Sequence, residues 1–98
     1  MRAVELAVYA DALAGEAASL SARAERARSR LRQAAIERRA RCELSETAIG
    51  RLEGLGVLGA IDERAVRAEL RELESGLEAL EELQSWVEGE LAGATNAA

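Results

Sequence analysis

The chain has 98 residues, of which 49% are hydrophobic, 32% are charged and 2% are aromatic, and its net charge is −5. This length allows one domain at most. The lack of histidine and the single cysteine exclude a disulfide framework, the common zinc-ligand spacings and Ser-His or Cys-His catalytic pairs. Abundant Ala, Leu, Glu and Arg are typical of long helices and coiled coils. We therefore expect an all-α, non-enzymatic protein with no catalytic residues, no cofactor and no bound metal.

A long first helix is predicted from about residue 3 to about residue 44. Its apolar side chains recur in alternating steps of four and three residues, which is the spacing of a heptad seam. The seam consists of Leu6, Ala10, Leu13, Ala17, Leu20, Ala24, Ala27, Leu31 and Ala34.

The second half of this helix contains a basic segment, residues 23 to 41. It carries eight arginines against two glutamates, a local charge of +6. One interpretation is that the arginines pair with acids of the same chain and fix the helix register. The other is that they bind an anionic ligand. Nucleic acid is a disfavoured partner, because the chain is acidic overall and no aromatic residues are interleaved with the arginines. The acids expected to pair are Glu69, Glu72, Glu74, Glu78, Glu81 and Glu82.

The spacing Glu25-x3-Ser29-x2-Arg32 within the basic segment resembles the opening of a repeat, E-x3-S-x2-R-x3-Q-x3-D. That repeat occurs in actinobacterial anti-sigma factors whose antiparallel coiled coil binds cyclic di-GMP. The Gln and Asp of the repeat are absent here, and there is no second copy. The resemblance implies a regulator in which Ser29 and Arg32 contact the nucleotide. We add Arg28 to this expected anionic-ligand surface.

A short helix and a turn are predicted between residues 45 and 61. Ser45 can cap a helix that ends at Gly54 or Gly56. The alternative is a first helix that continues to Leu52. Residues 54 to 59 fit the letters GxGxxG, but the residues before them have a helical pattern without a β-branched run. We therefore expect a glycine turn with positive φ angles rather than a nucleotide site.

A second long helix is predicted from about residue 62 to about residue 92, followed by a frayed tail from 93 to 98. Asp62 can cap its start, and Ala92-Gly93 offers a stop. Residues 62 to 90 hold ten acids against three arginines, a local charge of −7. The heptad seam consists of Val66, Leu70, Leu73, Leu77, Leu80, Gln84, Val87 and Leu91.

The two seams predict one domain, residues 1 to 98, built as an antiparallel two-helix hairpin or coiled coil. Joining them through the turn places residue n of the first helix roughly opposite residue 105 minus n. About a dozen residues at the start of the first helix then overhang and expose apolar side chains, which would mark an interface. The expected interface residues are Val4, Leu6, Val8, Tyr9 and Leu13 of the overhang, with Leu83 and Trp86 beside the second seam.

These patterns predict a protein–protein interaction or regulatory module that binds a protein partner or itself, the latter as a homodimer. The alternative function is the cyclic-di-GMP-responsive regulator. No run of 18 apolar residues is present, so we expect no membrane span and a cytoplasmic location. Arginine as the sole basic residue type suggests a bacterial source with a GC-rich genome. The length and hairpin plan are also similar to those of small secreted WXG proteins, and Trp86-x3-Glu90 resembles their tail signal.

Overall fold

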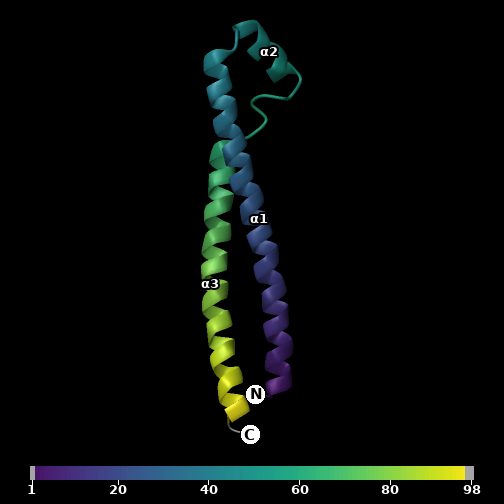
Figure 1. Ribbon diagram of the computed structural model, residues 1–98, viewed down its shortest axis with the longest axis vertical. Coiled ribbons are helices and arrows are strands. Elements are labelled where there is room, and N and C mark those ends of the chain that lie inside the picture. The colour runs from purple at the N-terminus through teal and green to yellow at the C-terminus, as the bar shows by residue number, and fades with distance from the viewer. Residues whose placement is uncertain (1, 97–98) are drawn as a thin grey trace. The chain divides into compact units, whose positions relative to one another are not determined.

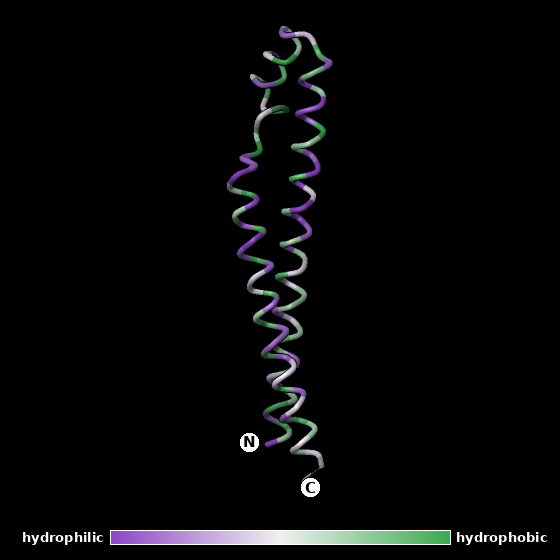
Figure 2. The backbone as a smooth tube through the Cα atoms, turned by 90° about the vertical axis from the view of Figure 1, so that its left-hand side faces the viewer, coloured by the Kyte–Doolittle hydropathy of each residue, from purple (hydrophilic) through white to green (hydrophobic). Residues whose placement is uncertain are grey.

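The computed structural model describes residues 2–96, which form three helices and no strand. The helices are α1 (Ala3–Glu43), α2 (Glu46–Gly54) and α3 (Glu63–Asn96) (Figure 1). The prediction of an all-α protein is therefore confirmed. Contacts divide the chain into unit 1, Met1–Arg23 with Glu72–Ala98, and unit 2, Ala24–Arg71. Figure 2 shows hydrophobic and hydrophilic residues alternating along both long helices.

Both predicted helix caps are present. Ser45 adopts an extended conformation, and its side chain accepts a hydrogen bond of 3.2 Å from the backbone N–H of Ala48. This cap begins α2 and separates it from α1, so the alternative of one continuous helix to Leu52 is wrong. Asp62 Oδ1 accepts a hydrogen bond of 3.1 Å from the Ala65 N–H and begins α3 in the same way.

The connection between α2 and α3 depends on two glycines. Gly56 and Gly59 have φ angles of 74° and 80°, which confirms the predicted glycine turn. At Gly59 the space is also restricted, because an added Cβ would lie 3.0 Å from the guanidinium of Arg41. Leu58, between these glycines, is buried and anchors the connection in unit 2.

The core of unit 1 joins the first part of α1 to the last part of α3, which run in opposite directions (Figure 1). Leu6 and Val87 at its centre are each 1% exposed, and Leu13 completes the buried cluster. The partly buried side chains packed against it are Ala10, Leu80, Leu83, Leu91 and Ala94.

The predicted overhang is wrong for Leu6 and Leu13, since both are buried against α3. One reason is that α3 does not stop at Ala92 but continues to Asn96. Residues 93 to 96 are therefore helical rather than frayed, while residues 97 and 98 lie outside the described part of the chain. The other reason is register: a Cβ on Gly76 would lie 4.0 Å from Leu20 Cδ1, whereas the predicted register puts residue 85 opposite Leu20.

Unit 2 has a thinner core. Its buried side chains include three alanines of α1, and α2 contributes none. Alanine buries little apolar area, so these contacts stabilise the unit less than leucines would. The buried residues are Ala24, Ala27, Ala34, Leu58 and Val66.

The corrected register leads to a stability prediction. Leu6→Ala is expected to lower the free energy of unfolding by about 2 to 5 kcal/mol, because it opens a cavity in the core of unit 1. Val4→Ala, two residues earlier but on an exposed position, should change it by less than about 0.5 kcal/mol. Urea unfolding followed by circular dichroism at low protein concentration measures both. If both substitutions lowered the free energy of unfolding equally and only slightly, Leu6 would be exposed, as the predicted overhang required.

Candidate functional site

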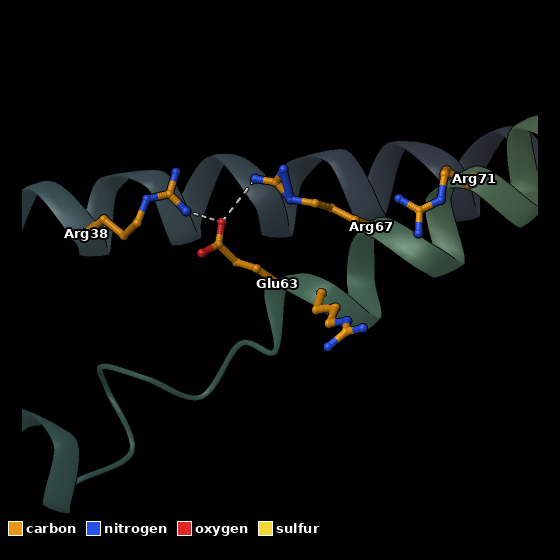
Figure 3. A pocket seen from close by; sticks show the side chains of 5 residues that line it. Arg38, Glu63, Arg67 and Arg71 are labelled. Carbon is orange, nitrogen blue, oxygen red and sulfur yellow. Dashed lines mark hydrogen bonds and ion pairs between the residues drawn. The ribbon is translucent and has the colours of Figure 1, made fainter.

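A strongly charged hollow of unit 2 lies between α1 and the first turns of α3. It is a cleft of about 440 Å³, lined by four arginines and one glutamate (Figure 3). With Glu63 ionised, these five side chains carry a charge of +3. The lining residues are Arg38, Glu63, Arg64, Arg67 and Arg71, and we call this hollow the arginine cleft.

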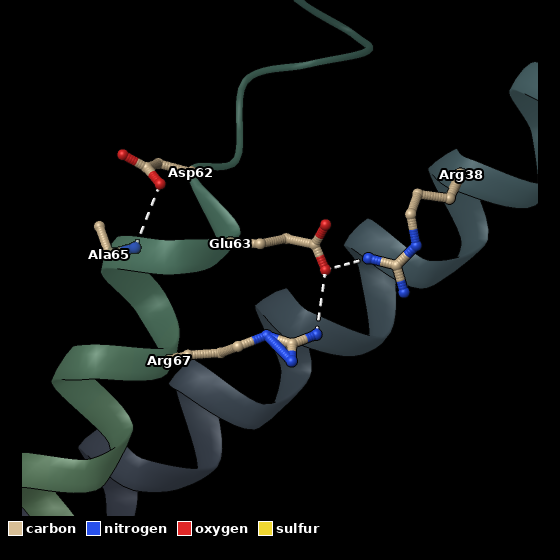
Figure 4. Close-up of polar contacts among 5 residues, drawn as sticks. All are labelled: Arg38, Asp62, Glu63, Ala65 and Arg67. Atoms are coloured by element: carbon tan, nitrogen blue, oxygen red, sulfur yellow. Dashed lines mark hydrogen bonds and ion pairs between the residues drawn. The ribbon is translucent and has the colours of Figure 1, made fainter.

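Helical periodicity places the arginines of α3 together. Arg64, Arg67 and Arg71 are separated by three and four residues, so they share one face of the helix. The Asp62 cap fixes where α3 begins and thereby sets the position of this face (Figure 4). Arg38 reaches the same cleft from α1.

Glu63 is the centre of the polar contacts in the arginine cleft. One carboxylate oxygen, Oε1, accepts hydrogen bonds from Arg38 Nη1 and, at 3.3 Å, from Arg67 Nη2 (Figures 3 and 4). Among residues 2–96, no ion pair is found for Arg64 or Arg71. The hydrogen bond from Arg38 lowers the pKa of Glu63 below its usual range, against an opposing effect of burial, and raises the pKa of Arg38. The carboxylate is therefore ionised at neutral pH.

A smaller cavity of about 190 Å³ adjoins the arginine cleft and shares Arg38 and Glu63 with it. Glu37 also lines this cavity, and its Oε1 is buried with no hydrogen-bond partner among the described residues. A buried carboxylate oxygen repels anions. The smaller cavity is lined by two arginines and two glutamates, so it lacks the excess of basic side chains found in the arginine cleft beside it.

The anionic-ligand surface expected from the sequence lies elsewhere on α1. Glu25 Oε1 accepts a hydrogen bond of 2.8 Å from Arg32 Nη2, and Arg28 Nη1 lies 3.8 Å from Glu25 Oε2. The bond from Arg32 lowers the pKa of Glu25. Arg28 and Arg32 are therefore held by an acid of their own helix, and Ser29 is exposed. Cyclic di-GMP binding at these residues stays a prediction.

The basic segment does form ion pairs with other helices of unit 2, as one of its two interpretations predicts. Arg38 pairs with Glu63 of α3, and Arg41 Nη1 lies 3.6 Å from Glu53 Oε1 of α2. Neither acid belongs to the predicted set. Arg38 meets Glu63 because α3 begins level with Arg38, whereas the predicted register put residue 42 opposite Glu63.

The residues expected at a partner interface fall into two groups. Leu6 and Leu13 belong to the core of unit 1, and Leu83 packs against that core. The four exposed residues are Val4, Val8, Tyr9 and Trp86, with 74%, 65%, 45% and 51% of their surface accessible. Whether a partner covers these four stays a prediction.

An uncharged line follows the side of α1 opposite its seam. Val8 lies two residues after Leu6, about 200° around the helix, and steps of seven residues from Val8 keep the same position in the heptad repeat. Every member of the line is exposed and none is charged. The members are Val8, Gly15, Ala22, Ser29 and Ile36, and we call them the outer face of α1.

Sequence reasoning missed the arginine cleft. The spacing of Arg64, Arg67 and Arg71 was a usable signal, because three basic residues on one face of an acidic helix are unusual. The presence of Arg38 in the same cleft could not be predicted from spacing, since it depends on where α3 begins relative to α1.

Comparison with protein-family models, curated proteins and solved structures finds no match for this chain. Within residues 2–96, no helix is long and apolar enough to cross a membrane, and no group of three His, Cys, Asp or Glu could hold a metal ion.

The Glu63 contacts predict a pH-dependent stability difference. Because the pKa of Glu63 is lower in the folded chain, its contribution is present above the unfolded-state pKa and is lost as the pH falls through the folded-state pKa. Glu63→Gln should therefore lower the melting temperature slightly at pH 7 and leave it unchanged in strong acid.

A double-mutant cycle separates this contact from the general effect of an acid in the first turn of a helix. In an Arg38→Gln background, the effect of Glu63→Gln at pH 7 should shrink. Glu69→Gln, on the same helix, is the control for the loss of one acid from α3. An undiminished effect in the Arg38→Gln background would contradict the assigned contact.

Proposed function

We propose that the chain is a non-enzymatic, self-associating interaction module in which two copies pair through the outer face of α1. The observation that carries this proposal is the uncharged line itself. A helix face that meets only water is normally polar or charged, yet Val8 is 65% exposed and Ile36 is 70% exposed. The chain has 32% charged residues, yet none of them lies on this line. An exposed line of this kind indicates contact with another apolar surface.

The finer architecture belongs to the same proposal: α1 and α3 form one antiparallel two-helix hairpin. Two contacts support it. In unit 1, Leu6 and Leu13 of α1 pack against Val87 of α3. In unit 2, Arg38 of α1 bonds to Glu63 of α3.

The small core also favours a partner. Nine hydrophobic side chains are buried among the described residues, and three of them are alanines. A core with few large side chains stabilises a fold only weakly, and oligomerisation is a common way to bury more apolar area. The apolar residues of α3 are concentrated on one face, whereas those of α1 are distributed around the helix. A second contact is thus expected on α1 rather than on α3.

Charge favours a second copy of this chain as the partner. Unit 1 holds ten acids and two arginines, a charge of −8, whereas unit 2 holds eight acids and eleven arginines, a charge of +3. Unit 1 of one copy therefore attracts unit 2 of another. A twofold axis makes both contacts at once and closes the assembly as a dimer.

We propose an antiparallel pairing of the two α1 helices, centred on Ala22. It brings the two outer faces into contact, and it allows unit 1 of each copy to attract unit 2 of the other. Val8 of one copy then lies opposite Ile36 of the other, and Gly15 lies opposite Ser29. The small side chains at the centre permit a close approach. A parallel pairing would instead place the two basic segments side by side, which is unfavourable.

Tyr9 and Trp86 lie off the outer face of α1, so they remain available to a different protein that the dimer would bind. Cys42 is exposed and unpaired, which supports a reducing, cytoplasmic location.

Light scattering tests self-association. At about 100 µM, a range in which weak helical dimers form, the parent should show twice its chain mass of 10.5 kDa. The double variant Val8→Glu, Ile36→Glu should show the single mass with unchanged helicity, because it places charges on the outer face. Leu55→Glu, on an exposed apolar residue near the end of α2, is the control and should remain dimeric. A monomeric parent would overturn self-association, and a dimeric double variant would overturn the assigned face.

Disulfide trapping tests the direction of pairing. In a Cys42→Ser background, Ala22→Cys should cross-link between copies under mild oxidation, because a residue on the twofold axis faces itself. Val8→Cys and Ile36→Cys, each made alone, should not cross-link in an antiparallel pair. Cross-linking of all three variants would indicate a parallel pair and contradict the proposed register.

A further inference from the structure

The arginine cleft supports an inference that goes beyond self-association. We infer that it binds a diphosphate group, either as free pyrophosphate or as the diphosphate of a nucleotide. Nothing in the proposed dimer requires four arginines around one carboxylate, and the outer face of α1 includes none of them.

The distribution of basic residues along α3 is the first argument. The helix has 34 residues, and its three arginines, Arg64, Arg67 and Arg71, all line the cleft. One of them, Arg67, stabilises the helix itself, since it pairs with Glu63 four residues away at 3.3 Å. Arg64 and Arg71 form no ion pair within residues 2–96, so their guanidinium donors remain for a ligand.

Glu63 shows that the cleft can hold an oxyanion. Its Oε1 accepts from Arg38 and Arg67 together, so two guanidinium groups already converge on one oxygen (Figure 3). A guanidinium group has five N–H donors in a planar fork, which suits the oxygens of phosphate. Arg38 and Arg67 therefore retain donors beyond those that Glu63 uses.

The charge of the cleft selects the ligand class. One phosphoryl group carries about −1.5 to −2 at neutral pH, so a charge of +3 is matched by two linked phosphates better than by one. A volume of about 440 Å³ falls within the usual range of small-molecule sites. No aromatic side chain lines the cleft, so it offers no aromatic ring on which a base could stack. Recognition therefore depends on the phosphates.

Two neighbouring features define where the ligand lies. The Asp62 carboxylate already accepts the Ala65 N–H at the start of α3, so the cap amide is not counted as a donor. The unpaired Glu37 oxygen in the adjoining cavity repels an anion on that side. The diphosphate is accordingly placed on the side of Arg64 and Arg71.

Isothermal titration calorimetry on the full chain tests the inference with pyrophosphate, ADP and inorganic phosphate as probes. Pyrophosphate and ADP should bind with dissociation constants within about tenfold of each other, and phosphate should bind at least about tenfold more weakly. The tighter of the first two probes identifies the source of the diphosphate. No heat from pyrophosphate, or binding of ADP alone, overturns the inference.

Matched variants separate a built site from general attraction by a basic surface. The double variant Arg64→Gln, Arg71→Gln should weaken pyrophosphate binding by about tenfold or more. The control Arg26→Gln, Arg30→Gln removes the same charge outside the cleft and should leave the affinity nearly unchanged. If both double variants weakened pyrophosphate binding equally, the binding would be non-specific attraction by a basic surface, and the inference would be overturned.

Glu63→Gln provides a test with the opposite sign. The substitution removes the carboxylate that competes for Arg38 and Arg67, so pyrophosphate should bind more tightly than to the parent. Circular dichroism establishes that the variant remains helical. Weaker binding by a folded Glu63→Gln variant would contradict a site in which Glu63 occupies donors that the diphosphate uses.

Discussion

The point at which α3 begins is the constraint on which the rest of unit 2 depends. Asp62 caps the helix through the Ala65 N–H, and Glu63, the next residue, bonds to Arg38 of α1. Once these two contacts are made, helical periodicity assigns every later side chain of α3 to a face. The arginine cleft follows directly, since Arg67 and Arg71 come one and two turns after Glu63.

Features that depend on a few neighbouring residues could be predicted from the sequence. A serine or aspartate caps a helix through an amide three residues away, so Ser45 and Asp62 were identifiable without knowledge of the fold. Register depends instead on contacts between distant segments. A shift by one heptad keeps every seam residue on the seam. The sequence therefore indicated that Leu6 lies on a seam, but it did not indicate that α3 covers this residue.

The same distinction applies to the candidate site. Arg64, Arg67 and Arg71 share a face by their spacing alone, whereas their meeting with Arg38 required the register. The net charge of −5 likewise concealed the basic unit, because it is the sum of −8 on unit 1 and +3 on unit 2. Charge counted over segments of sequence predicted ion pairs between α1 and the acidic part of α3. Charge counted over compact units favours attraction between two copies.

The two proposed surfaces use different residues but share one electrostatic quantity, the positive charge of unit 2. A diphosphate in the arginine cleft would cancel most of the +3 on this unit, and with it the attraction that unit 1 of a second copy exerts on it. Binding of the anion and self-association would then oppose each other, and by linkage the dimer would bind the anion less tightly than the monomer does. This opposition requires no change of fold, because it acts through charge alone. A chain with a thin core and separated charges is suited to such coupling, since a small ligand can shift a weak association without disturbing the helices.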